Sequence, residues 1–150
     1  MLHKEGFRAY QSGLFTWSGV FWEDGEPLRN GEKDLTFVGV IWQVAEFFLF
    51  LSRYYDSLGD GEGVFVRIQA LGLLGRELSA RDPKIAWNGG YISAANTFVF
   101  ERTIRGVELK TSPMDLAVEC SRRILLLFNW NSVSDEIIRG WQQRLVKRAY

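Results

Sequence analysis

Apolar residues recur at every second position in two segments of the chain, and this period predicts two half-buried strands. In 97–105, the apolar face carries Phe98, Phe100 and Ile104, while charged and hydroxyl side chains occupy the opposite face. In 64–71, valine, isoleucine and alanine alternate with residues that include arginine and glutamine. A strand with one apolar and one polar face is typical of an antiparallel sheet that has one side in water.

Three further segments predict weaker strands. The aromatic segment 7–22 is expected to form a strand with a bend or bulge at Gly19. The segments 73–80 and 84–92 are separated by a proline-containing turn, and the second of them runs through a glycine-rich turn. These segments and the two alternating ones predict an antiparallel sheet of about four to five strands.

The longest apolar segment predicts a helix that has Asp34 as its N-cap and runs to Leu58, where Gly59 ends it. Most of its circumference is apolar, and the remaining positions fall in one narrow stripe at steps of three and four. The stripe consists of Thr36, Gly39, Gln43, Glu46, Phe50, Arg53 and Ser57. A helix with a single wet stripe must be covered on its other sides, so we expect it to be the central element of the core, packed on the sheet.

Two helices are predicted at the C-terminal end. Ser112 is an N-cap followed by Pro113 at the first helical position, and this helix runs to about Phe128. Ser134 caps the last helix, whose acidic first turn and basic last turn suit the helix dipole. The fold prediction is therefore one α+β domain over residues 1–150, with an antiparallel sheet packed on a long central helix and two C-terminal helices.

Composition narrows the class of protein. The 150 residues are 47% hydrophobic, with 18 basic and 18 acidic side chains, which is typical of a folded domain and excludes intrinsic disorder. One Cys and one His exclude a disulfide framework and Cys- or His-rich zinc sites. The N-terminal residues lack the apolar run of a secretory signal, and the uncharged stretch Leu35–Ala45 is far shorter than the ~20 residues of a membrane span. We therefore expect a cytoplasmic protein without a membrane partner.

Few residues offer catalytic chemistry. The single histidine, His3, lies close to a chain end and is expected to be exposed rather than catalytic. Cys120 is expected to be a buried core thiol. The glycine run at 59, 61 and 63 closes a helix and opens a strand, which is the reverse of a phosphate-binding loop, so turn chemistry explains it. The sequence thus predicts no catalytic residue, no metal site and no cofactor.

Glu46 is the one carboxylate for which the sequence also suggests a catalytic role. It stands among apolar neighbours, and a desolvated glutamate has a raised pKa and can serve as a general acid or base. The other interpretations are that Glu46 lies on the wet stripe, or that it pairs with Arg53 or Arg105. No second carboxylate can be matched to it. The acidic segment 23–34 is expected to be a solvated loop.

The two C-terminal helices carry the cations of a predicted nucleic-acid surface. Arg144 and Arg148 are one turn apart on the last helix, opposite its apolar stripe. With arginines of the preceding helix they would form a basic ridge. The residues of this predicted basic ridge are Arg122, Arg123, Arg139, Arg144, Lys147 and Arg148. A net charge of zero favours the alternative, a solvated helix face whose terminal cations stabilise the dipole.

Three stretches of the chain together resemble a known family. They are His3-Lys4-Glu5-Gly6-Phe7-Arg8-Ala9-Tyr10, the segment 47–76 with its helix end and following strand, and Leu126-Leu127-Phe128-Asn129-Trp130. In this order they resemble the C-terminal region that follows the Schlafen/Alba-type DNA-binding domain in some bacterial proteins. The resemblance implies an accessory domain, because the family's nucleic-acid function belongs to the preceding domain. No catalytic residue of the family falls on the matching positions.

The leading functional hypothesis is a non-catalytic accessory or interaction domain. Its partner would be another protein, a second copy of the chain or a neighbouring nucleic-acid-binding domain, contacted through exposed aromatic residues expected around Trp17, Trp22 and Trp130. The alternative is direct nucleic-acid binding by the last helix. A third hypothesis is a small-molecule-binding or hydrolytic domain that uses Glu46.

Overall fold

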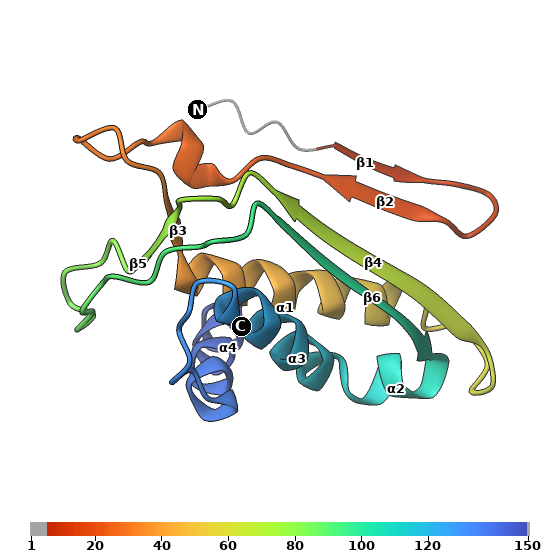
Figure 1. Cartoon of the computed structure of the whole chain (residues 1–150). Coiled ribbons are helices and arrows are strands. Elements are labelled where there is room, and N and C mark those ends of the chain that lie inside the picture. The colour runs from red at the N-terminus through yellow and green to blue at the C-terminus, as the bar shows by residue number, and fades with distance from the viewer. Residues whose placement is uncertain (1–5, 150) are drawn as a thin grey trace.

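Strands and helices are mixed along the chain in the computed structural model, which describes residues 6–149 (Figure 1). The elements are β1 (Gly6–Ala9), β2 (Phe15–Ser18), the 3-10 helix η1 (Trp22–Gly25), β3 (Asp34–Thr36), α1 (Phe37–Tyr54), β4 (Gly63–Leu71), β5 (Glu77–Ser79), β6 (Thr97–Arg105), α2 (Gly106–Thr111), α3 (Pro113–Leu126) and α4 (Asp135–Ala149). This mixture of helix and strand confirms the predicted α+β class.

The strands of residues 6–149 form small sheets of two strands each, so the prediction of one sheet of about four to five strands is wrong. β1 pairs with β2 and β4 with β6, both antiparallel, whereas β3 pairs with β5 in parallel. The segments 73–80 and 84–92 form little β-structure because positive φ angles at Gly75 and Gly89 turn the chain away from an extended path. What remains of them is the short β5 and a single bridge at Ile92.

β4 and β6 confirm the two alternating strands. They pair over nine residues each, from Gly63 opposite Arg105 to Leu71 opposite Thr97. Side chains at alternate positions are buried on the inner face, and those between them are exposed. We call this pair the β4–β6 ribbon, and it lies across α1 (Figure 1).

α1 is the central helix of the core, as predicted. Ile41, Ala45 and Phe48 are completely buried, and α3 and α4 both pack against the helix. The ring of Phe48 meets Phe100 of β6 edge-on, with 6.2 Å between ring centroids. The exposed residues of α1 include most of the predicted stripe, namely Gln43, Glu46, Phe50 and Arg53. By length and composition alone, with a mean hydropathy of 1.3, α1 could also cross a membrane, a property it shares with many core helices.

The two ends of α1 differ from the prediction. The helix begins at Phe37 with Thr36 as its N-cap residue and ends at Tyr54 rather than at Leu58. Asp34 is not a cap, because it lies in β3 and its carboxylate is bound elsewhere. Thr36 is buried rather than part of the wet stripe.

The C-terminal helices follow the prediction closely. The N–H of Ile137 donates a hydrogen bond to Ser134 Oγ at 3.3 Å, so Ser134 caps α4 as expected. Pro113 opens α3, although the side chain of Ser112 makes no capping hydrogen bond. The short helix α2 was not predicted, because it follows β6 without a break and has no side-chain cap.

The β1–β2 hairpin rests on the end of α1. Residues 6–18 therefore form a hairpin that turns at Gly13, where φ is +85°, and the prediction of one strand over 7–22 with a bend at Gly19 is wrong. The ring of Phe15 lies 4.7 Å from that of Phe50, measured between centroids. The hydroxyl of Tyr55 also donates a 2.5 Å hydrogen bond to the carbonyl of Gly13.

Candidate interaction surfaces

A buried ionic network surrounds the start of α1. Asp34 is 2% exposed, and its carboxylate accepts two hydrogen bonds from the guanidinium of Arg81 and one from the hydroxyl of Ser79. Burial opposes ionisation of Asp34, but the hydrogen bonds from Arg81 and Ser79 outweigh it and hold the pKa of this carboxyl below its usual range. The network therefore ties β3 to the loop after β5.

The acidic segment 23–34 is only partly the solvated loop that was expected. Glu23 is 3% exposed, and its Oε1 accepts hydrogen bonds from the N–H of Thr36 at 2.8 Å and from the Thr36 hydroxyl at 2.6 Å. Asp24 accepts a 2.7 Å hydrogen bond from Arg76, which lowers the pKa of Asp24. The prediction was wrong for Glu23 and Asp34 because their partners lie far away in the sequence. These contacts hold the fold, and each carboxylate is satisfied by protein groups.

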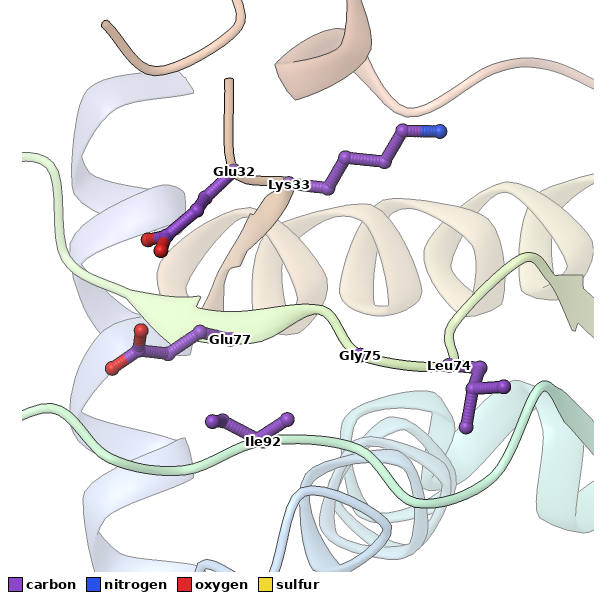
Figure 2. Close-up of a pocket in the computed structure, with 6 residues that line it drawn as sticks. All are labelled: Glu32, Lys33, Leu74, Gly75, Glu77 and Ile92. Carbon is purple, nitrogen blue, oxygen red and sulfur yellow. The ribbon is translucent and has the colours of Figure 1, made fainter. Parts of the chain in front are cut away.

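An open pocket of about 300 Å³ lies beside this network and is shown in Figure 2. It is lined by Glu32, Lys33, Leu74, Gly75, Glu77 and Ile92. The carboxylates of Glu32 and Glu77 lie on the same side of the pocket, while Lys33 points away from them (Figure 2). Glu77 already accepts a 2.6 Å hydrogen bond from the N–H of Gly90. Within residues 6–149, no group of three or more His, Cys, Asp or Glu side chains could hold a metal ion.

Glu46 does not have the buried environment that the acid–base hypothesis assumed. It is exposed on α1, so the desolvation on which the acid–base hypothesis depended is absent. The interpretation that Glu46 belongs to the wet stripe is the one that the structure confirms.

Cys120 is completely buried in α3, as predicted. Burial raises the pKa of the Cys120 thiol to about 12, so the thiolate needed for nucleophilic chemistry does not form near neutral pH. His3 lies outside the described residues.

The predicted basic ridge is divided by ion pairs between α3 and α4. Arg122 donates a 2.7 Å hydrogen bond to Asp135, and Arg139 donates one of 2.6 Å to Asp115. Each of these arginines is thus neutralised by a carboxylate on the opposite helix. These ion pairs join α3 to α4. Counting the charges along one helix could not predict them, because each pair involves a residue of the other helix.

Four cations of the predicted ridge have no carboxylate partner among the described residues, namely Arg123, Arg144, Lys147 and Arg148. Arg123 lies over the ring of Phe100, 5.4 Å from its centroid. The guanidinium carbon of Arg144 lies 4.3 Å from the centroid of the Trp141 ring, and that of Arg148 lies 5.0 Å from the Trp42 ring. The end of α4 therefore carries three of these four cations, and the fourth, Arg123, lies on α3.

A second exposed surface is the outer face of the β4–β6 ribbon. We call it the ribbon face and define it by the outward side chains Phe65, Arg67, Gln69 and Leu71 of β4 and Thr97, Val99, Glu101 and Thr103 of β6. Three large apolar side chains on it are exposed, Phe65 by 63%, Leu71 by 59% and Val99 by 42%. Between them, Arg67 of β4 forms an ion pair with Glu101 of β6.

The three tryptophans expected at the surface have different environments. Trp17 is 47% exposed on the hairpin, whereas Trp130 is only 6% exposed and belongs to the core. Trp22 is half-buried under the guanidinium of Arg81. The expectation of exposure holds for Trp17 and is wrong for Trp130, whose ring packs edge-on against that of Trp87.

No protein-family model, no curated protein and no solved structure matches this chain.

Proposed function

We propose that the chain is a non-catalytic interaction domain that pairs with a second copy of itself through the ribbon face. The observation that carries the proposal is the exposure of Phe65, Leu71 and Val99 together on one regular surface. Exposed apolar patches on a folded domain are typical of sites of protein association, because burying them releases ordered water.

The order of residues on the ribbon face favours a second copy as the partner. The ion pair of Arg67 and Glu101 lies in the middle, with Phe65 toward one end and Leu71 toward the other. A two-fold axis that lies in this face and runs across the strands through the ion pair would place the Phe65 end of one copy against the end of the other that carries Val99 and Leu71. The same axis would bring the two Arg67–Glu101 ion pairs together, and because each pair is already neutral, no unpaired charge would be buried.

The resemblance to the region after a Schlafen/Alba-type DNA-binding domain fits this proposal. An accessory domain that self-associates would bring two neighbouring nucleic-acid-binding domains together. The cytoplasmic location and the absence of a membrane partner, both expected from the sequence, belong to the same proposal.

The test is a substitution of the most exposed apolar side chain of the ribbon face. Phe65→Glu is expected to weaken self-association at least about tenfold, because a carboxylate buried at the contact costs more than about 1.4 kcal/mol. Molar mass would be measured by light scattering over a range of protein concentrations. Leu126→Glu is the matched control, because Leu126 is 41% exposed on α3, away from the ribbon face, and receives the same chemical change.

Self-association that is lost in Phe65→Glu and kept in Leu126→Glu supports the proposal. A wild-type chain that stays monomeric at all concentrations contradicts it, as does equal loss in both variants. If the monomer instead binds a different protein through Phe65, the second copy is the wrong partner.

A further inference from the structure

The C-terminal end of α4 presents cations that the fold leaves unpaired. Arg144, Lys147 and Arg148 are exposed, and none of them has a carboxylate partner within residues 6–149. On the same helix, Arg139 is neutralised by Asp115 of α3. The charge of α4 is therefore compensated in its first half and uncompensated in its last turns.

Two tryptophans hold the two arginines in place. Arg144 stacks on Trp141 and Arg148 on Trp42, with 4.3 Å and 5.0 Å between each guanidinium carbon and the ring centroid. The indole N–H of Trp42 donates a 2.9 Å hydrogen bond to the carbonyl of Trp141, so α1 and α4 are joined at this point. We call these four residues the Arg–Trp cluster.

Stacking orders the arginines without using their hydrogen-bond donors. A guanidinium carries its N–H groups in its plane, whereas the contact with an indole is made by its face. The ring contacts restrict Arg144 and Arg148 in conformation, and neither arginine donates a side-chain hydrogen bond to another residue within 6–149. The entropy that a flexible arginine loses on binding a ligand is partly lost already in the folded chain.

The helix that carries the cluster is firmly anchored. Ile138 is completely buried, and the side-chain amide of Gln142 donates a 3.2 Å hydrogen bond to the carbonyl of Met114 in α3. Figure 1 shows α4 packed beside the start of α1, where Trp42 lies in the sequence. The cluster is thus a fixed surface feature and not part of a flexible tail.

We propose that the Arg–Trp cluster, together with Lys147, binds the phosphodiester backbone of a nucleic acid. Arg144 and Arg148 are separated by one helical turn, a rise of about 6 Å, so a chain of repeated anions can contact both at once. Guanidinium groups match phosphate oxygens with paired N–H donors. The three cations outweigh the charge of about −0.5 that the helix dipole places at this end.

The chemistry of the cluster indicates binding without base recognition. One face of each of the Trp42 and Trp141 rings is occupied by an arginine, which reduces the aromatic surface on which bases could stack. Contacts to phosphates carry no sequence information directly. The site is smaller than the predicted basic ridge, because Arg122 and Arg139 are bound to Asp135 and Asp115.

The proposal is tested with a fluorescein-labelled single-stranded DNA of mixed sequence, whose anisotropy is measured at a series of salt concentrations. Three phosphate contacts are expected to give a slope of about −2 in a plot of log K against log salt. The double variant Arg144→Gln/Arg148→Gln should bind about tenfold or more weakly at low salt, with a slope shallower by about 1.4.

The matched control is Arg122→Gln/Arg139→Gln, which changes the net charge by the same amount at two arginines that are already paired. It is expected to keep the wild-type slope. Near-ultraviolet circular dichroism of each variant would check that the fold is retained. The variant Arg144→Lys/Arg148→Lys keeps the charge but loses the planar stack, and is expected to bind with intermediate affinity.

Loss of affinity and slope in the Arg144/Arg148 variant alone supports the proposal. Absence of binding by the wild-type chain at low salt overturns it, and so does an equal effect of the control variant, which would indicate a response to net charge only. Competition by polyglutamate as effective as by unlabelled DNA also overturns it, because the ligand would then be any polyanion. The ribbon face plays no part in this test, so the result is independent of self-association.

Discussion

At the scale of single residues, Asp34 has the most demanding environment among the described carboxylates. It is 2% exposed and remains a carboxylate because Arg81 and Ser79 donate hydrogen bonds to it. Arg81 adopts a positive φ of 52°, which is uncommon for a residue with a side chain. The side chain that pairs with Asp34 is thus carried by a residue in an uncommon backbone conformation.

Replacing Asp34 by Asn is expected to destabilise the fold by about 3 kcal/mol, because Arg81 loses its charged partner in a largely buried place. The pKa of Asp34 is lowered from 3.8 on folding, so the unfolded chain takes up its proton first as the pH falls. The stabilisation is therefore present above about pH 4 and lost below it. Urea unfolding across this pH range should show the wild type and Asp34→Asn converging in acid.

The exposed carboxylate Asp60 provides the control for this experiment. Asp60→Asn is expected to leave the free energy of unfolding within about 0.5 kcal/mol of wild type at every pH. If the free energies of unfolding of Asp34→Asn and wild type differ by the same amount down to acid pH, the stabilisation does not come from an ionised Asp34.

At the scale of elements, the first turn of α1 depends on a glycine. A Cβ atom at Gly39 would lie 2.4 Å from Thr36 Oγ1 and 3.5 Å from Glu23 Oε1. Gly39 therefore lets η1 approach the helix closely enough for Glu23 to bind Thr36. Gly39 falls on the predicted wet stripe but is only partly exposed. It occupies this position because a side chain there would clash with Thr36.

Two Gly→Ala substitutions should have opposite effects. Alanine in an exposed helix normally stabilises by about 0.5–1 kcal/mol, and Gly140→Ala in α4 should do so because nothing lies within 4 Å of its added Cβ. Gly39→Ala should instead destabilise, by about 1–3 kcal/mol, because it displaces the Thr36 hydroxyl from Glu23. Thermal unfolding of the two variants provides the measurement, and stabilisation by Gly39→Ala would show that the contact is dispensable.

At the scale of the whole molecule, the β1–β2 hairpin is separate from the main core. It contacts α1 through Phe15, whose ring lies near those of Phe50 and Tyr54, and through the hydrogen bond from Tyr55 to Gly13. The residues of the hairpin are otherwise largely exposed. Segments with few buried apolar contacts open locally more readily than the core.

Phe15→Ala is therefore expected to release the hairpin without unfolding the rest. Amide hydrogens of β1 and β2 should exchange faster, corresponding to a loss of about 2 kcal/mol in local opening free energy, while those of β4 and β6 keep their protection. Leu14→Ala serves as the control, because Leu14 is 54% exposed beside it. Faster exchange throughout the molecule would show that the hairpin belongs to the same cooperative unit as the core.

The candidate sites were predictable only in part. Arg144 and Arg148 were singled out because helical spacing places them on one face, opposite the apolar stripe. Arg139 shares their helix and charge, yet it is bound to Asp115. Which arginine is free depends on the packing of α3 against α4, and no pattern within α4 contains that information.

The sequence by itself determined β4, β6, α3, α4 and the central position of α1, because the period of apolar residues and the caps act between near neighbours in the chain. The tertiary structure alone decided that the strands form pairs and not one sheet, and that Glu23 and Asp34 are buried. It also decided that two tryptophans on different helices order Arg144 and Arg148. Burial and ion pairing are set by distances between segments far apart in the chain, which local periodicity does not encode.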